Sequence, residues 1–102
     1  MIDVKSTQEF TRESKSGVVV VDFYAEWCGP CKQMTPVLQK ISEEVTDVKF
    51  LKINVETCFE VSNSYNVSSI PTLIFLKDGV VVNQITGTRD SKKIKDMISC
   101  SK

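Results

Sequence analysis

Residues 18–31 read VVVVDFYAEWCGPC and hold both the strongest strand signal of the chain and its one close pair of cysteines. The segment Val18 to Ala25 is β-branched or aromatic with almost no polar break, which is typical of a central strand that is buried on both faces. Such strands are usually parallel to a neighbour. Cys28 and Cys31 then stand between this strand and whatever element follows it.

The segment after the cysteines has the pattern of an amphipathic helix. Apolar residues recur at helical spacing from Cys31 onward, with Lys and Glu between them, and Pro36 is expected to kink the helix. Residues 50–55 read as the next strand, and Thr57-Cys58-Phe59-Glu60 has the capping-box form that opens a shorter helix. This alternation predicts a parallel βαβ arrangement. The apolar helical positions are Met34, Val37, Leu38, Ile41 and Val45.

The two ends of the chain complete the expected fold. Residues 72–77 and 80–85 flank Asp78-Gly79, a strong signal for an antiparallel hairpin, and a last helix follows with Ile94, Met97 and Ile98 on one side. Near the N-terminus, Ser6-Thr7-Gln8-Glu9 has capping-box form and predicts a short helix that Gly17 closes. We therefore expect one α/β domain over residues 1–102, with a mixed sheet (βαβαβ, then a β-hairpin and a helix) covered by helices on both faces.

Composition excludes several classes of function. The chain has 102 residues, 41% of them hydrophobic, and its 13 basic residues balance 13 acidic ones, so nothing would attract nucleic acid or anionic lipid. The first residues lack the basic and apolar segments of a secretory signal, and the longest apolar run, Val18 to Val21, is too short to cross a membrane. Provided the chain is complete, we expect a cytoplasmic monomer.

Four cysteines could form two disulfides, but in a cytoplasmic protein a close pair is more often catalytic or metal-binding. The chain has no histidine, and Cys58 and Cys100 do not form a second close pair. The ligand spacing of a structural zinc site is therefore missing. Redox chemistry is the favoured interpretation, and no metal site is expected.

Both sulfurs are predicted to lie at the start of the long helix. Backbone N–H groups and the positive end of the helix dipole favour a thiolate there, which lowers the pKa of the more exposed sulfur, Cys28. The thiolate is the species that attacks a disulfide. Pro30 stiffens the turn between the cysteines and lacks an N–H that would need a partner, which should favour the reduced dithiol.

Asp22 stands within the valine-rich strand, where burial would raise its pKa. The alternative is a solvated carboxylate at a strand end, and the residues alone leave the two interpretations about even.

The cysteine motif, its strand and helix, and Ile70-Pro71-Thr72 resemble the thioredoxin family over essentially the whole chain. A lone pair of cysteines would be weak support, but further residues stand where the family pattern places them. The resemblance implies the thioredoxin fold and the activity of a protein-disulfide reductase. The residues that carry it are Phe23, Ala25, Trp27, Pro36, Lys52, Pro71, Gly79 and Gly87.

The resemblance also implies roles at the redox centre. Cys28 attacks a substrate disulfide and Cys31 resolves the mixed disulfide, while Asp22 exchanges a proton with Cys31 through water. The amino group of Lys52 approaches Asp22 and lowers its pKa again, although an exposed lysine at a strand edge is an equal alternative on the residues alone. Pro71 corresponds to a cis-proline that lies against the two sulfurs, an uncommon state that only the resemblance supports.

A shallow apolar docking surface around Cys28 is implied as well, made of Trp27, Gly29, Pro30, Ile70 and Gly87. For Trp27 and Ile70, core packing is the ordinary alternative. The resemblance further implies that thioredoxin reductase, with NADPH and FAD, recycles the oxidised protein, so no cofactor is bound here. Expected substrates are disulfide-containing proteins such as peroxiredoxins, ribonucleotide reductase and methionine sulfoxide reductase.

Some features depart from the family pattern or leave alternatives. Cys58 and Cys100 have no shared role and are interpreted as small buried hydrophobes, although Cys58, in the first turn of a helix, could be activated for oxidation. Tyr24 stands where many bacterial relatives carry tryptophan. A disulfide isomerase or oxidant is less favoured because such relatives usually carry histidine inside the motif. A scaffolding module with secondary redox chemistry is the alternative from another class.

Overall fold

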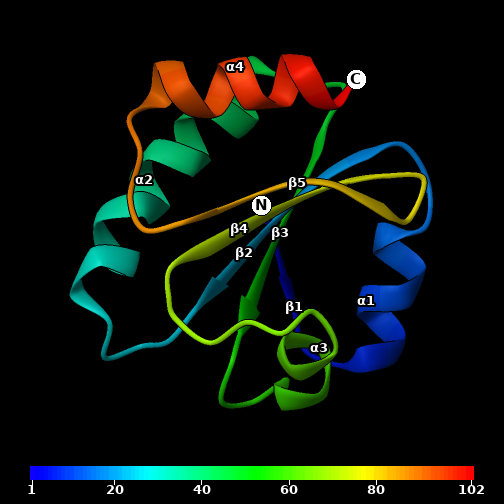
Figure 1. The fold of residues 1–102 in the computed structure, drawn as a ribbon, viewed down its shortest axis with the longest axis vertical. Helices are drawn as coiled ribbons and strands as arrows, with labels where there is room; N and C mark the ends of the chain where they lie inside the picture. Colours follow the sequence, from blue (N-terminus) through cyan, green and yellow to red (C-terminus); the bar gives the residue numbers. More distant parts are fainter.

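The computed structural model describes residues 1–102 and is built around one mixed five-stranded sheet (Figure 1). The strand order across the sheet is β1-β3-β2-β4-β5, so β2, the strand predicted to be central, is in the middle. The strands are β1 (Ile2–Val4), β2 (Val18–Tyr24), β3 (Lys49–Asn54), β4 (Thr72–Lys77) and β5 (Val80–Thr86).

Four helices cover the sheet in two layers. The apolar side chains of α2 and α4 pack into one core cluster and those of α1 and α3 into another, with strand residues in both clusters. Figure 1 shows α2 and α4 near each other at the top and left, away from α1 and α3. The expected helices on both faces of a mixed sheet are confirmed. The helices are α1 (Thr7–Ser14), α2 (Gly29–Glu44), α3 (Phe59–Ser64) and α4 (Ser91–Ser101).

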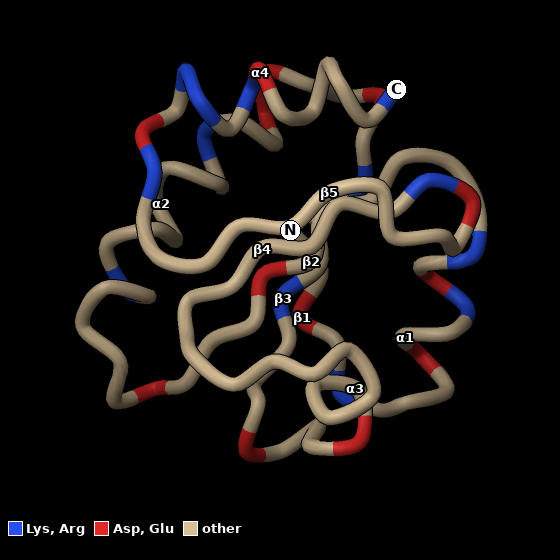
Figure 2. The backbone as a smooth tube through the Cα atoms, viewed as in Figure 1, with Lys and Arg blue, Asp and Glu red and all other residues tan.

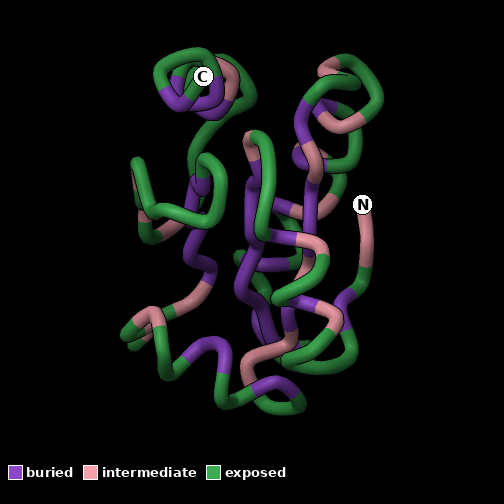
Figure 3. The backbone as a smooth tube through the Cα atoms, turned by 90° about the vertical axis from the view of Figure 1, so that its right-hand side faces the viewer, coloured by how far each residue is buried: buried purple, intermediate pink, exposed green.

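Side chains of β2 alternate between the two cores, as period-2 geometry requires. Val19, Val21 and Phe23 belong to the cluster under α1 and α3, whereas Val20 packs toward α2 and α4. Figure 3 shows the resulting arrangement, with the buried residues concentrated in the central strands and exposed residues on the outer helices and loops. The nearly continuous apolar run of β2 follows from this double burial.

Strand pairing confirms the predicted βαβ unit. β2 and β3 are parallel, with Asp22 opposite Lys52, and α2 connects them. β4 pairs with the other side of β2 in the antiparallel direction and continues into β5 through the predicted hairpin. β1 pairs in parallel with β3 and was not predicted, because a three-residue strand carries too short a pattern to be recognised locally.

The hairpin turn has the backbone that its sequence predicts. Asp78 and Gly79 have φ angles of 51° and 83°, the two left-handed residues of a two-residue hairpin turn. Farther along, the register shifts between Phe75 and Leu76, where the partner in β5 changes from Asn83 to Val81.

The first helix begins as predicted and ends earlier. Ser6 Oγ accepts the Glu9 N–H at 3.1 Å, but the Glu9 carboxylate accepts the N–H of Lys5, at 2.7 Å, instead of that of the cap residue. The helix ends at Ser14 and Gly17 is not its terminator. Gly17, with φ of 75°, instead donates its N–H to Asp78 Oδ1 at 2.8 Å, and its carbonyl accepts the Asp78 N–H at 2.9 Å. Gly17 therefore anchors the hairpin turn.

The other two helix predictions differ in outcome. α2 runs from Gly29 to Glu44 as one helix with Pro36 inside it, where the missing N–H removes one helical hydrogen bond. α3 begins at Phe59 with Cys58 as its cap residue and without a side-chain capping bond, so the capping box predicted at Thr57 is wrong. Thr57 Oγ1 instead contacts the Asn54 carbonyl at 3.5 Å.

No helix is both long and apolar enough to pass through a bilayer.

Candidate active site

Cys28 and Cys31 lie where the central strand gives way to the long helix. Cys28 is the N-cap residue of α2 and Cys31 is in its first turn; the two form a disulfide with a Cα–Cα distance of 5.3 Å. The Cys31 N–H points at Cys28 Sγ, 3.2 Å away. The predicted position at the start of the helix is confirmed, and the backbone offers a hydrogen bond to any negative charge on Cys28.

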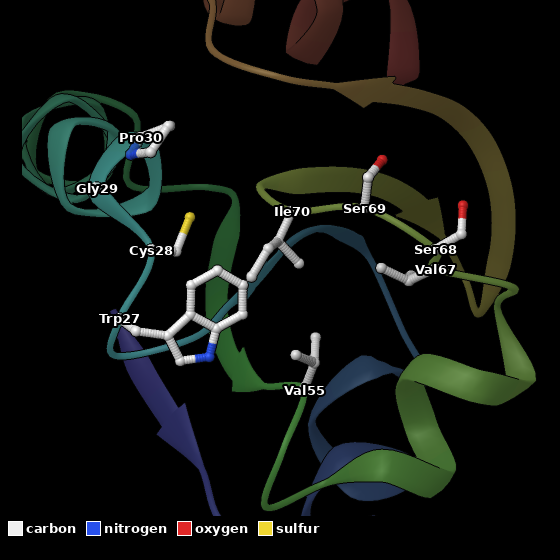
Figure 4. Close-up of a pocket in the computed structure, with 9 residues that line it drawn as sticks. All are labelled: Trp27, Cys28, Gly29, Pro30, Val55, Val67, Ser68, Ser69 and Ile70. Atoms are coloured by element: carbon white, nitrogen blue, oxygen red, sulfur yellow. The ribbon is translucent and has the colours of Figure 1, made fainter.

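The two sulfurs differ in access to the surface. Both cysteines are buried, with exposed fractions of 3% for Cys28 and 1% for Cys31. Only Cys28 lines the groove of about 540 Å³ that opens beside the pair, and Figure 4 shows it at the edge of that groove. A partner that enters the groove therefore meets Cys28.

The groove is mainly apolar and combines the loops after β2 and β3 and the loop before β4 with the start of α2 (Figure 4). Four of the residues expected to form a docking surface line it: Trp27, Gly29, Pro30 and Ile70. Trp27 is 70% exposed, so the core-packing alternative for it is wrong, while Ile70 is partly buried and packs against two core clusters. Val55, Val67, Ser68 and Ser69 also line the groove and were not predicted from the sequence.

The missed residues had a signal that could have identified them. Val67, Ser68 and Ser69 directly precede Ile70, and Val55 follows the end of β3, the neighbour of β2. In a parallel pair the carboxyl ends of both strands meet at the same edge of the sheet, which is where Cys28 follows β2.

Trp27 is held at the groove by a loop from the neighbouring strand. Its indole Nε1–H donates to Glu56 Oε2 at 3.2 Å, although both side chains are exposed. Glu56 lies just beyond β3, so this contact joins the two loops that follow β2 and β3. The ring is thereby oriented beside Cys28, as Figure 4 shows.

The Ile70–Pro71 peptide bond is cis, in agreement with the resemblance. Pro71 is buried and does not line the groove; its carbonyl accepts the Gly87 N–H at 2.8 Å. Gly87 has a φ of 90°, a conformation that favours glycine, and it also lies outside the groove lining. Gly87 was expected in the docking surface. The structure instead shows it outside the groove lining, in a backbone hydrogen bond with Pro71.

Asp22 is buried, with 1% of its surface exposed, and neither carboxylate oxygen has a hydrogen-bond partner. The interpretation as a solvated strand-end carboxylate is wrong. Burial raises the pKa of Asp22 from 3.8 to about 7, and the positive charge of Lys52 opposes this rise. Asp22 therefore changes its protonation near neutral pH.

Lys52 lies on β3, which is an interior strand of the sheet between β1 and β2. Its Nζ atom is 4.4 Å from the centroid of the Tyr24 ring, a cation–π contact. Lys52 is opposite Asp22 in the strand register and is only partly exposed, so the structure does not support the alternative of an exposed lysine at a strand edge.

The remaining cysteines are not part of the redox centre. Cys58 is buried and its Sγ lies 3.6 Å from the Val4 carbonyl, which agrees with the expected small hydrophobe. Cys100 is exposed, so the same prediction is wrong for it: Ile94, Met97, Ile98 and Ser101 form the buried side of α4, and Cys100 lies outside that stripe. No cluster of three or more His, Cys, Asp or Glu side chains that could hold a metal ion is present.

Comparison with known proteins identifies the family. The family model described as Thioredoxin matches residues 2–100. A thioredoxin of Chlamydia trachomatis is 42% identical over 99 residues, which is 97% of each chain. A solved Plasmodium falciparum thioredoxin superposes with a TM-score of 0.91 at 35% identity, covering 98% of each chain.

One further solved structure concerns a peroxiredoxin. It is described as the structural basis of the thiol resolving mechanism in yeast mitochondrial 1-Cys peroxiredoxin via glutathione/thioredoxin systems. It has a TM-score of 0.89 at 31% identity and covers 98% of this chain and 94% of that one. Together with a disulfide at the start of α2, these matches show that the chain belongs to the thioredoxin family of protein-disulfide oxidoreductases.

Proposed function

We propose that this protein reduces disulfide bonds in other proteins with Cys28 as the attacking thiolate and Cys31 as the resolving thiol. The observation that carries this assignment is the asymmetry of the pair. Cys28 Sγ accepts a backbone N–H at the start of α2 and Cys28 lines the groove, whereas Cys31 lies in the first turn of the helix and does not line the groove. A substrate sulfur reaches Cys28 first, and the helix start stabilises its negative charge.

Two exchange steps account for the reaction. The Cys28 thiolate attacks one sulfur of the substrate disulfide, so a mixed disulfide forms and the other substrate sulfur leaves as a thiolate. The Cys31 thiolate then attacks Cys28 Sγ, which closes the Cys28–Cys31 disulfide and releases the second substrate thiolate. The substrate gains two electrons and the protein loses two.

Asp22 is proposed to accept the proton of Cys31 before the second step, through water. Its pKa of about 7 allows it to take up and release a proton at neutral pH. Its oxygens have no partner within the protein, so they are available to a water molecule. Lys52 is proposed to tune this acid through its charge.

The groove is proposed to hold an extended segment of the substrate. Trp27, Gly29, Pro30 and Ile70 offer an apolar surface next to Cys28. Pro71 and Gly87 are proposed to support this surface through the hydrogen bond between their backbones.

The cellular setting is proposed from family membership. Thioredoxin reductase, using NADPH and FAD, would return the oxidised protein to the dithiol, and no cofactor would be bound by this chain. Peroxiredoxins are favoured substrates because a similar solved structure concerns thiol resolution in a peroxiredoxin. Ribonucleotide reductase and methionine sulfoxide reductase are further candidates. Residues 1–102 would act as one monomeric domain in the cytoplasm.

Replacing one cysteine at a time tests the two roles. Cys31→Ser should form a mixed disulfide with insulin or a peptide disulfide that persists, because the resolving thiol is missing. Cys28→Ser should form none and should lose insulin reduction with dithiothreitol. Mass spectrometry of the adducts and turbidity report the two outcomes.

The double variant Cys58→Ser/Cys100→Ser is the matched control, because it removes the two thiols outside the redox centre. It should keep the wild-type rate. Equal rates for Cys28→Ser and the wild type would instead support the scaffolding alternative and remove the catalytic assignment.

A further inference from the structure

A row of charged residues crosses three strands at the level of Asp22, and Figure 2 shows it as acidic, basic and acidic positions on β2, β3 and β1. Asp3 on β1 is paired with Lys52 on β3, and Lys52 is paired with Asp22 on β2. Paired residues of neighbouring strands point to the same face of a sheet. Lys52 therefore lies between two carboxylates, of which Asp22 is buried and Asp3 has a side chain that is 44% exposed.

Tyr24 connects the members of this row. It follows Asp22 by two residues on β2, so it lies on the same face, and it is 7% exposed. Lys52 forms an ion pair with neither carboxylate; its Nζ is 4.4 Å from the Tyr24 ring centroid. The Tyr24 hydroxyl donates to Asp3 Oδ1 at 3.4 Å, and the same carboxylate is paired with Lys5 at 2.9 Å.

We propose that Tyr24 is a positioning residue that holds the Lys52 ammonium beside Asp22. The face of its ring binds the ammonium, and its hydroxyl is fixed by the hydrogen bond to Asp3. The consequence for the reaction rests on the proposed role of Asp22 in proton transfer. Tyr24 would then set the position of the positive charge that acts on the buried Asp22 carboxyl.

The physical reason is that Asp3 and Asp22 compete for the Lys52 ammonium. Asp3 is at an edge strand and is partly hydrated, so it is the less costly partner for an ammonium that is free to move. The ring face attracts the cation by its quadrupole and keeps it on the interior side of Asp3. Burial and the Asp3 carboxylate both raise the pKa of Tyr24, so its hydroxyl stays a donor at neutral pH.

The other groups around Asp22 do not replace Lys52. Leu73, its partner on β4, is uncharged, and Cys31 of α2 is in the disulfide in the oxidised protein. Lys5 is paired with Asp3. Glu26, which follows β2 and acts on Tyr24, is negatively charged and therefore cannot stabilise the Asp22 carboxylate. Lys52 is thus the cation that lowers the pKa of Asp22.

The test is a double-mutant cycle on the oxidised protein, in which the two active-site cysteines do not titrate. The carboxyl carbon resonance of Asp22 is followed by NMR from pH 4 to pH 10 in the wild type, Tyr24→Leu, Lys52→Met and the double variant. Removing a nearby cation should raise the pKa of Asp22 by about 1 in Lys52→Met. Tyr24→Phe, which keeps the ring, should stay closer to the wild type than Tyr24→Leu.

The cycle separates positioning from hydration, because water that enters the space left by Tyr24→Leu acts equally in both backgrounds. The pKa change caused by Tyr24→Leu should be more positive, by roughly 0.5 or more, when Lys52 is present than in the Lys52→Met background. The same change in both backgrounds would overturn the proposal. Tyr65→Leu is the matched control on the opposite face of the sheet and should leave the pKa of Asp22 in place.

The result of the NMR cycle does not depend on whether Asp22 transfers a proton in the reaction. Insulin reduction by Asp22→Asn tests proton transfer separately, so unchanged activity there would reject the role of Asp22 while the NMR cycle still decides whether Tyr24 positions Lys52. Conversely, equal shifts in the cycle would reject positioning and leave the role of Asp22 untouched.

Discussion

Asp22 costs the folded protein stability at neutral and alkaline pH. Its pKa rises from 3.8 to about 7 on folding, so the unfolded chain loses this proton at lower pH than the folded one. Between these two values the folded state binds more protons, and its stability falls as the pH rises. Above pH 7 the penalty levels off at about 4 kcal/mol, since each pKa unit corresponds to about 1.4 kcal/mol.

Removing this carboxyl should therefore stabilise the protein in a pH-dependent way. The gain in free energy of unfolding from Asp22→Ala should be about 2 to 3 kcal/mol larger at pH 8 than at pH 5, because the cavity cost is the same at both values. Urea unfolding of the oxidised protein measures it. Asp96→Ala, an exposed aspartate on α4, is the control. A gain that is equal at both pH values would contradict the burial of an ionisable Asp22.

Single residues show what the sequence could predict and what it could not. The apolar neighbours of Asp22 on β2 indicated a strand covered on both faces, but they left burial of Asp22 and a solvated carboxylate at a strand end about equally supported; the structure shows that Asp22 is buried. The contact of Tyr24 with Asp3 joins residues 21 positions apart and depends on β1, so no local pattern contains it. Val67, Ser68 and Ser69 were missed because their only signal was their place next to Ile70, and their own residue types do not specify that this loop lines a groove.

Two similar capping-box patterns behave differently in the helices. Ser6 caps α1 through its hydroxyl, whereas Thr57 does not cap α3, which begins one residue later. The first pattern directly follows β1, which leads into the helix with an extended residue at the cap position. The second follows a turn in which Asn54 Oδ1 accepts the N–H of Glu56 at 2.8 Å and its backbone carbonyl accepts that of Cys58 at 2.9 Å. The hydrogen bonds of this turn form in place of a side-chain cap on α3.

Alanine at these two positions should thus have unequal effects. Ser6→Ala should lower the free energy of unfolding by about 1 kcal/mol, because a helix N–H loses its partner. Thr57→Ala, which has the same pattern without the bond, should change it by less than about 0.5 kcal/mol. Chemical denaturation of both variants at one pH compares them. A cost at Thr57 equal to that at Ser6 would show that both hydroxyls act as caps.

Elements with long and regular patterns were predicted well, whereas the three-residue strand β1 was missed. The repeating apolar positions of α2 and the continuous apolar run of β2 act over many residues, so the structure retains both. β1 has three residues and is stabilised by parallel pairing with a strand about fifty residues away. Gly17 was misinterpreted because a left-handed glycine suits both a helix end and the turn contact that it makes with Asp78.

The topology of the whole molecule places the chemistry at one edge of the sheet. β1, β2 and β3 run parallel, so the loops after β2 and β3 meet there and bring Trp27, Cys28 and Glu56 together. β4 runs in the opposite direction, and its start brings the cis bond at Pro71 to the same edge. Local patterns predicted four of the five strands but not the strand order, because the order depends on contacts between distant segments; the family resemblance implied the fold.

The central claim is that Cys28 and Cys31 form a reversible disulfide in the folded protein, and a redox titration tests it most directly. The protein is equilibrated in dithiothreitol or glutathione buffers of graded potential, free thiols are alkylated, and each cysteine is quantified by peptide mass spectrometry. We predict that Cys28 and Cys31 change together in one two-electron transition, about 30 mV per tenfold change in the ratio of oxidised to reduced protein, while Cys58 and Cys100 stay reduced. The absence of a Cys28–Cys31 disulfide at any potential would contradict the account.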